Sequence, residues 1–360
     1  MVAPIFFVDG NTIWHARLAA ALAEFRPVFS FEVSSGLLPS LRRSNDSKPT
    51  RVSISLPRGW ASSTAFIGQS FLHRFIRRAA EACDAKPVLF LTSPAYAPLA
   101  SRIFGELPIV SYTADDYRSY VGWGGTAIAG KERQIHQRSE LSVFVSDTLR
   151  ERAVREFGID PARTFVSPNA TERHFAAKDR YEPLPILAGR PRPLVGVLGA
   201  LTERLNLASL AEVVSNETVG TFLVAGPASA SVLEQYPVFR SAKVVVAGQI
   251  DHSRMHEYAK ALDLAIIPYA RNELNWHCSP MRLYDHLASG VPIISIRGCD
   301  QVDRCNHEGV HIVDESGLKA KVEELVARGL QRSDTSPPEC FWDQRAKALT
   351  NIIDMVLSAK

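Results

Sequence analysis

The sequence predicts an α/β protein made of two Rossmann-like domains with parallel sheets. Short apolar runs alternate with amphipathic stretches along the whole 360-residue chain, as they do in βαβ units. A cluster of prolines at 181–193 separates a first series of such runs from a second, and it indicates an interdomain linker. The length also suits two domains of ordinary size.

The first domain is expected at 1–180, where apolar runs of strand length recur. The candidate strands are Ile5–Asp9, Val28–Val33, Val52–Leu56, Val88–Leu91, Ile109–Tyr112, Ser142–Val145 and Thr164–Val166. Amphipathic stretches between them, for example 14–25 and 148–157, predict helices. This alternation favours parallel strands joined by helical crossovers.

The second domain is expected at 194–337 and repeats the same pattern. The candidate strands are Leu194–Leu198, Thr221–Ala225, Val244–Ala247, Leu264–Ile267, Val291–Ser295 and His311–Val313. The final segment, 338–360, is expected to be a C-terminal helix, since Phe341–Leu357 has a helical pattern.

Composition excludes several classes of protein. Hydrophobic content of 46% and charged content of 22% are those of a globular protein, and the net charge of +3 argues against a nucleic-acid binder. The five cysteines are scattered, which indicates reduced thiols in a cytoplasmic protein. Because the chain starts with a strand-like run and has no apolar stretch of transmembrane length, neither a signal peptide nor a membrane span is expected.

The most informative segment is 264–296, which predicts strand, loop, helix and strand. An apolar run ends at Pro268, and after a polar loop Ser279 is predicted as a helix N-cap with Pro280 at the first helical position. Gly290 is predicted to end that helix, before the next apolar run.

This helix has the side chains that a nucleotide site needs. Met281, Arg282 and Asp285 fall on one helix face. A helix N-terminus suits a phosphate, and Arg282 adds a forked cation. One turn later, Asp285 is placed to accept hydrogen bonds from a ribose diol. The alternative is an ordinary βαβ unit whose helix has a solvated polar face.

Residues 279–292, SPMRLYDHLASGVP, resemble the donor-sugar motif SP-x-[KR]-x-x-[DE]-x-[LM]-A-x-G-x-P of GT-B glycosyltransferases. The most similar subgroups are family-4-like bacterial enzymes of the teichuronic acid type and the xanthan glucuronosyltransferase type. The resemblance implies two Rossmann-like domains whose sheets face each other across a cleft, with the last helix crossing back to the first domain. One departure is His277, which stands eight residues before Asp285, where many family-4 members have a glutamate; the nearest acid upstream is Glu273.

The same resemblance assigns donor contacts in the preceding loops. Gly199 ends the glycine loop, and Arg204 matches the basic residue that binds the diphosphate; the alternative is a tight turn with a surface arginine. The pattern is not G-x-G-x-x-G, which argues against a dehydrogenase. The further candidates are Gly226 in the next loop, Gln249 and Ile250 for base contacts, and Tyr269 as a pocket wall, each of which is otherwise a loop or packing residue.

In the first domain, Asp115 and Asp116 follow an apolar strand, where a carboxylate can act as general base toward an acceptor hydroxyl. An N-cap for the following helix is the alternative. After the first strand, 11–15 (Asn11, Trp14, His15) is also expected at the cleft, and Asn169 matches an architectural turn. No D-x-D motif occurs, so neither a metal nor another cofactor is expected.

Residues 66–78, FIGQSFLHRFIRR, place basic side chains beside aromatic ones. This suits a helix lying on anionic lipid, and the alternative is a core helix with a solvated basic face. The sequence therefore predicts a GT-B glycosyltransferase, cytoplasmic and at the inner face of the membrane. It would move a sugar from a nucleotide-diphosphate sugar, UDP-linked, to a surface-polysaccharide or lipid-linked glycan acceptor. The alternatives are a GT-B epimerase of UDP-sugars and a catalytically silent GT-B scaffold that binds partners.

Overall fold

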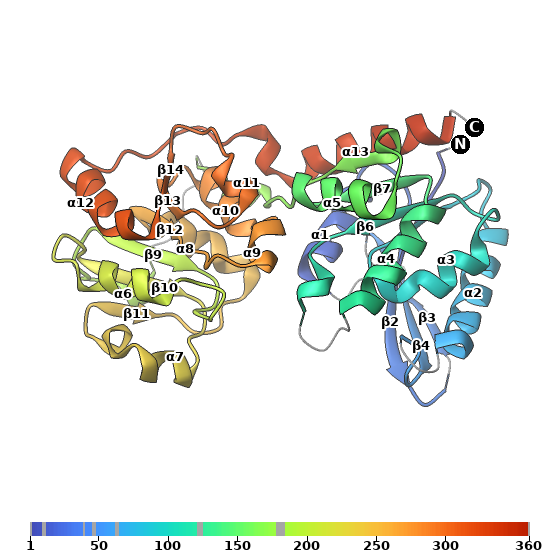
Figure 1. Cartoon of the computed structure of the whole chain (residues 1–360), viewed down its shortest axis with the longest axis horizontal. Helices are drawn as coiled ribbons and strands as arrows, with labels where there is room; N and C mark the ends of the chain where they lie inside the picture. Colours follow the sequence, from blue (N-terminus) through green and yellow to red (C-terminus); the bar gives the residue numbers. More distant parts are fainter. Residues whose placement is uncertain are drawn as a thin grey trace. The chain divides into compact units, whose positions relative to one another are not determined.

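The chain forms two compact units, each built around its own sheet (Figure 1). The computed structural model describes residues 2–8, 12–38, 40–44, 48–61, 65–120, 125–177 and 184–358. Unit 1 comprises Met1–Pro168 and Trp342–Lys360, and unit 2 comprises Asn169–Phe341. Both sheets are mostly parallel, so the predicted α/β class is confirmed.

Unit 1 alternates strands and helices as the apolar runs predict. Its elements are β1 Ile5–Val8, α1 Ile13–Leu22, β2 Val28–Gly36, β3 Ser40–Ser44, β4 Thr50–Pro57, α2 Ala65–Glu81, β5 Val88–Leu91, α3 Ala97–Ile103, β6 Ile109–Thr113, α4 Gly125–Arg138, β7 Leu141–Phe144, α5 Asp147–Phe157, β8 Thr164–Val166 and α13 Trp342–Ser358. Over the described residues the sheet has eight strands in the order β3-β4-β2-β1-β5-β6-β7-β8. The strands pair in parallel, apart from the antiparallel pair β3 and β4.

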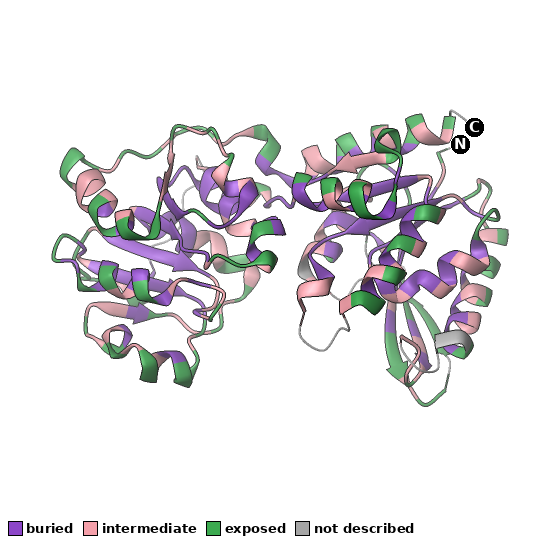
Figure 2. Cartoon of the chain, viewed as in Figure 1, coloured by how far each residue is buried: buried purple, intermediate pink, exposed green. Residues whose placement is uncertain are grey.

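The strand β3 has no counterpart among the predicted strands. All five of its side chains are exposed, and Figure 2 shows this edge of unit 1 in the colour of exposed residues. Because a strand that buries no face needs no apolar alternation, the sequence SLRRS does not indicate it.

The helix α2 covers the predicted membrane segment and packs on its own sheet. Leu72 and Ile76 are buried in the core of unit 1, and Phe71 and Phe75 pack against that core. The aromatic face therefore serves the fold, as the core-helix alternative predicts, while the arginines stay outside. In the described part of the chain, no helix combines the length and the apolar character that crossing a bilayer requires.

The helix α13 joins the end of the described chain to the start of unit 1. It packs on α1 (Figure 1). Arg26, which follows α1, is buried and forms an ion pair with Asp354 of α13. Unit 1 is thus built from two stretches of sequence, and the second stretch contributes α13, which covers α1.

Unit 2 has the strand order of a doubly wound nucleotide-binding sheet. Its elements are β9 Leu194–Leu198, α6 Leu207–Ser215, β10 Thr221–Ala225, α7 Ala230–Gln235, β11 Val244–Val246, α8 Met255–Ala261, β12 Leu264–Ile267, α9 Glu273–His277, α10 Met281–Ser289, β13 Ile293–Ile296, α11 Asp300–Asp303, β14 Val310–Val313 and α12 Leu318–Arg328. Over the described residues the order is β11-β10-β9-β12-β13-β14, all parallel. The direction of winding reverses between β9 and β12, and ligands bind at such a switch point.

The chain enters unit 2 earlier than the sequence predicts. The first domain was expected to extend to residue 180, but the units divide after Pro168. Phe175 and Leu184 are buried in the core of unit 2, which ties both residues to it. Residues 184–193 of the predicted linker accordingly belong to unit 2, and 181–183 lie outside the described residues.

Candidate functional site

Three of the predicted donor residues, Gly199, Tyr269 and Arg282, come together at the carboxyl ends of β9 and β12, at the switch point of the sheet. Gly199 directly follows β9, and its φ of +88° is a conformation that favours glycine. A Cβ there would lie 3.2 Å from the Arg282 guanidinium, at Nη2. Gly199 therefore lets the glycine loop and the arginine of α10 approach closely.

Gly226, which follows β10, supports the same loop. A Cβ at Gly226 would lie 2.4 Å from the carbonyl carbon and oxygen of Gly199. The Gly199 N–H in turn donates to the Ala225 carbonyl over 3.0 Å. Gly226 thus acts through backbone packing, which fixes the position of Gly199.

Arg282 is the side chain most clearly built for a ligand. Its Cζ lies 5.1 Å from the ring centre of Tyr269, a cation–π contact. Its Nη1 is buried, and no hydrogen-bond acceptor reaches this atom within the described part of the protein. A buried cationic donor without an acceptor is costly, so the arrangement favours an anion beside Gly199.

Arg204 lies in the same region and is oriented by Asn275, a fully buried side chain that sequence reasoning missed. The Arg204 Nε donates to Asn275 Oδ1 over 3.2 Å. The Asn275 Nδ2 donates to the carbonyls of Arg204 and Ala270, both over 2.8 Å. Asn275 thereby holds the loop after β9 against the loop after β12. Its polarity alone carries no signal, since asparagine is common in exposed loops.

Tyr269 forms the floor under the Arg282 guanidinium. The side chain is buried, and this burial raises the pKa of its hydroxyl above the ordinary value despite the nearby Arg282. Tyr269 therefore stays neutral and acts as an aromatic surface. The predicted role of a pocket wall is consistent with this placement.

Asp285 is buried one turn after Arg282 and already has a protein partner. The Thr171 hydroxyl donates to Asp285 Oδ1 over 2.5 Å. Thr171 is far from Asp285 in sequence, so no local motif could reveal this contact. The hydrogen bond fixes the carboxylate, and a ribose diol would have to share it with Thr171.

The predicted N-cap at Ser279 is wrong. Pro280 occupies the cap position of α10, Met281 is the first helical residue, and α10 has no side-chain cap. The Ser279 hydroxyl instead accepts a hydrogen bond from the Asn169 N–H over 2.9 Å, and the Ser279 carbonyl accepts from Asn169 Nδ2 over 2.7 Å. Ser279 and Asn169 therefore anchor the entry of α10 to the first turn of unit 2.

One histidine precedes the α10 motif and another lies within it. His277 lies 3.3 Å from Glu273 through Nε2 and Oε2, so the residue in the glutamate position is paired with the nearby acid. His286 is fully buried, and burial, reinforced by Arg282, lowers its pKa to about 3. His286 is therefore neutral and adds no charge to the site.

The base-contact candidates follow β11, the edge strand of the unit 2 sheet. Gln249 is exposed after β11, and Ile250 packs against the core of unit 2. Gly248 has a φ of +71° with open space around its Cβ position, so this loop turns toward solvent. Met281 is half-buried at the start of α10. These positions leave the predicted base contacts as proposals.

In unit 1 the two candidate acids have different surroundings. Asp116 is buried and accepts from Arg152 Nη2 over 2.6 Å, from the Ser119 hydroxyl over 2.5 Å, and from the Arg118 N–H. Asp115 accepts from the Tyr120 hydroxyl over 2.5 Å. Asp116 therefore caps the turn after β6, as the N-cap alternative predicts.

Two further predicted residues of the first domain are on α1. Trp14 and His15 lie on this helix, where His15 is buried and contacts the ring of Tyr112 edge-on. Asn11 lies outside the described residues. The surroundings of His15 are those of a packed core residue.

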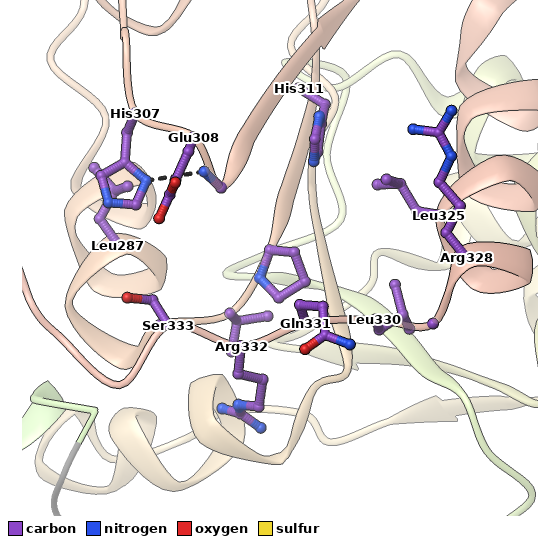
Figure 3. Close-up of a pocket in the computed structure, with 15 residues that line it drawn as sticks. Leu287, His307, Glu308, His311, Leu325, Arg328, Leu330, Gln331, Arg332 and Ser333 are labelled. Carbon is purple, nitrogen blue, oxygen red and sulfur yellow. Dashed lines mark hydrogen bonds between the residues drawn. The ribbon is translucent and has the colours of Figure 1, made fainter.

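A pocket of about 440 Å³ lies elsewhere in unit 2 (Figure 3). Its lining includes 290–292, which precedes β13, and 307–309, which precedes β14. Figure 3 shows the Gly309 N–H donating to the His307 ring, with Leu325 and Arg328 across the pocket. Both strands begin at this pocket. The pocket therefore lies at the amino ends of the strands, whereas Arg282 lies at the carboxyl ends.

A curated relative carries the resemblance that residues 279–292 indicate. The relative is TuaH of Bacillus subtilis (strain 168), provisionally named a teichuronic acid biosynthesis glycosyltransferase, and it is 25% identical over 169 residues. The match spans 46% of this chain and 43% of the relative, less than half of either. The resemblance to bacterial enzymes of the teichuronic acid type is confirmed by this similarity. No protein-family model matches the chain.

Solved structures decide the fold. Sucrose-phosphate synthase from Thermosynechococcus elongatus matches with a TM-score of 0.73 at 14% identity, over 99% of this chain and 100% of that chain. The chain has the GT-B fold. Anabaena HepE in complex with UDP-glucose shares the GT-B fold, with a TM-score of 0.68 at 13% identity over 99% of this chain and 100% of that chain. The predicted GT-B fold is confirmed by these two structures.

Proposed function

We propose that the protein is a glycosyltransferase that takes a sugar from a UDP-sugar donor bound in unit 2. The observation that carries this proposal is Arg282, whose buried Nη1 has no acceptor within the described residues beside Gly199. The diphosphate of a nucleotide sugar supplies such an acceptor. Two further facts support the proposal: the name of TuaH, and the binding of UDP-glucose by HepE on the same fold.

Each donor residue has a role in this proposal. Arg282 and Arg204 bind the diphosphate, and Gly199 allows its close approach. Asp285 accepts from the ribose beside Thr171, and Gln249 and Ile250 contact the base. As the sugar leaves, charge develops on the diphosphate, and two fixed guanidinium groups stabilise this charge without a metal ion.

On the acceptor side we propose Asp115 as the general base. Asp116 is held by Arg152 and by the Ser119 hydroxyl, contacts that favour a structural role for this carboxylate. Asp115 is held by a neutral phenol, and a carboxylate in that setting can take a proton from an acceptor hydroxyl. The proposed acceptor is a surface-polysaccharide or lipid-linked glycan, in line with the name of TuaH.

We further propose a cytoplasmic location with peripheral contact at the inner face of the membrane. Within 66–78 this contact would rest on the exposed Ile67 and on Arg74, Arg77 and Arg78, since the aromatic residues Phe71 and Phe75 pack inward. Basic side chains beside an exposed apolar one suit an anionic bilayer surface.

Calorimetric titration with UDP tests the donor proposal, and product analysis tests the reaction. A glycosyltransferase binds UDP and, with a membrane extract as acceptor source, converts UDP-sugar to UDP and a glycan product. Appearance of an epimerised UDP-sugar would identify the epimerase instead. Failure to bind UDP or any other nucleoside diphosphate would leave the silent scaffold.

A further inference from the structure

Two buried thiols of unit 2 lie against each other beside the candidate donor site. The Sγ atoms of Cys278 and Cys299 are 3.8 Å apart. The Cys299 thiol also donates to the Cys278 carbonyl over 3.5 Å. The structure assigns neither of these cysteines to a disulfide. Cys278 and Cys299 are called the dithiol below.

The dithiol connects the ends of two short helices. Cys278 is the residue that directly follows α9, and Cys299 is the residue before α11. Both have extended backbone, and neither is inside a helix or strand. A disulfide requires the sulfur atoms to close from 3.8 Å to ~2.0 Å. Segment ends can provide such a movement more easily than the middle of a helix.

The position of the dithiol links it to the donor residues. Cys278 immediately precedes Ser279, whose two hydrogen bonds to Asn169 fix the entry of α10. Both thiols are also near Tyr269, and each of them helps to raise the pKa of its hydroxyl group. Tyr269 in turn supports the Arg282 guanidinium. A shift of Cys278 therefore reaches both the start of α10 and the floor under Arg282.

We propose that Cys278 and Cys299 form a reversible disulfide, a redox-controlled modification site at the start of α10. The oxidant is a peroxide. Cys278, 6% exposed against 0% for Cys299, reacts first. Its thiol loses a proton, the thiolate attacks one peroxide oxygen and becomes a sulfenic acid as the O–O bond breaks, and the leaving hydroxide takes up the proton to form water. The Cys299 sulfur then attacks the sulfenic sulfur, and a second water leaves.

The overall reaction converts two thiols and one hydrogen peroxide into one disulfide and two waters. The two sulfur atoms are oxidised and the peroxide is reduced. A dithiol reductant reverses the change by thiol–disulfide exchange. Disulfides in a reducing compartment are mostly of this transient kind.

The disulfide lowers donor affinity, a consequence that rests on the proposed function of the site. Closing the dithiol displaces the residue before Ser279 and hence the helix that carries Arg282. Displacements of the order of 1 Å in a binding geometry have large effects. We expect UDP to bind roughly tenfold more weakly to the oxidised protein.

Peptide mapping of the full chain tests the modification itself. The protein is treated with hydrogen peroxide, blocked with an alkylating reagent and digested without reductant. The expected product is a cross-linked pair of peptides containing Cys278 and Cys299, which dithiothreitol separates. Cys299→Ser should abolish this product, while Cys305→Ser, which changes a half-buried thiol of the same unit, should leave it intact.

Three results would overturn the proposal. Both thiols could stay reduced while other cysteines oxidise, Cys278 could stop at a sulfinic acid, or Cys278 could link to a different cysteine. If Cys299→Ser does not fold, reversal of the wild-type cross-link by dithiothreitol still decides. UDP titration of the oxidised and reduced protein then tests the effect on the donor site: equal affinities would refute it. Absence of UDP binding to the reduced protein would refute the donor proposal alone, because peptide mapping does not depend on UDP.

Discussion

At the residue scale, the donor site depends most on Arg282. Arg282→Ala removes a charge-assisted contact with the diphosphate, of the order of 1.5–3 kcal/mol. We expect the affinity for UDP to fall roughly ten- to hundredfold, measured by calorimetric titration. Arg254→Ala is the matched control, because this exposed arginine of unit 2 pairs only locally with Glu257 among the described contacts.

Asp285 tests the ribose contact separately. Asp285→Ala should weaken UDP binding but should change pyrophosphate binding much less, because pyrophosphate lacks a ribose. The Thr171 hydroxyl loses its acceptor in this variant, so a circular dichroism spectrum must first show an intact fold. Unchanged UDP affinity in folded Arg282→Ala and Asp285→Ala proteins would remove the main support for a donor site.

The sequence shows the ligand-facing residues of this site better than those that position them. Arg282 and Gly199 belong to local patterns, in which spacing and residue type indicate chemistry. Asn275 and Thr171 act through partners distant in sequence, and no local pattern contains both members of such a pair. Ser279 fits the pattern of an N-cap, yet its hydroxyl bonds to the distant Asn169.

At the element scale, α4 contributes a buried histidine that makes stability depend on pH. The ring nitrogens of His136 form hydrogen bonds with the hydroxyls of Ser111, Ser142 and Thr113, at 2.9, 3.0 and 3.1 Å. Burial lowers its pKa to about 3. Below pH ~6.5 the unfolded chain therefore binds a proton that the folded protein excludes, and stability falls as pH falls.

We expect His136→Gln to lose this dependence. The variant is expected to be less stable than the wild type at pH 7. Between pH 7 and pH 5 the wild type loses roughly 2 kcal/mol of unfolding free energy relative to the variant, so the gap between the two proteins narrows by that amount. Urea unfolding at several pH values measures it. Glu132→Gln is a control of opposite sign: burial raises the pKa of Glu132 to about 7, so the wild type gains stability relative to this variant as pH falls from 7. If the unfolding free energies of the wild type and His136→Gln differ by the same amount at every pH, protonation of His136 does not cause the pH dependence.

The helix α2 is the element on which membrane contact depends. Reversing the charge of Arg74, Arg77 and Arg78 should abolish sedimentation with anionic vesicles at low salt, because the attraction to lipid is electrostatic. The unchanged protein should also release at high salt. Reversal of Arg155 alone, an exposed arginine of α5, shows how much one charge reversal away from α2 weakens vesicle binding. Equal binding by the α2 variant would exclude this surface.

Elements that bury a face are visible in the sequence, and those that do not are hidden. The apolar runs mark the buried strands of both sheets within three residues, because burial requires apolar side chains. The exposed β3 has no such requirement, and the short α9 and α11 bury mostly polar side chains, namely Asn275, His277 and Asp300. The same logic explains α2, in which one pattern fits both a lipid-facing and a core-facing helix.

At the scale of the whole molecule, the stability of unit 1 depends on residues that follow unit 2. Leu349 of α13 is fully buried in unit 1, so Leu349→Ala should destabilise that unit by about 2–5 kcal/mol. Met355 of the same helix is exposed, and Met355→Ala should change stability by less than ~0.5 kcal/mol. Denaturant unfolding of both variants measures this. If Leu349→Ala is as stable as Met355→Ala, α13 contributes little to the stability of unit 1.

The return of α13 to unit 1 also sets an order of events during translation. The ribosome makes most of unit 1 first, then all of unit 2, and only afterwards the helix that covers α1. At a synthesis rate of roughly 5–20 residues per second, the apolar surface of α1 that α13 covers stays exposed to water for many seconds. Unit 2 can fold on emerging, whereas unit 1 is completed last. The part of the chain synthesised first is thus the part most in need of a chaperone.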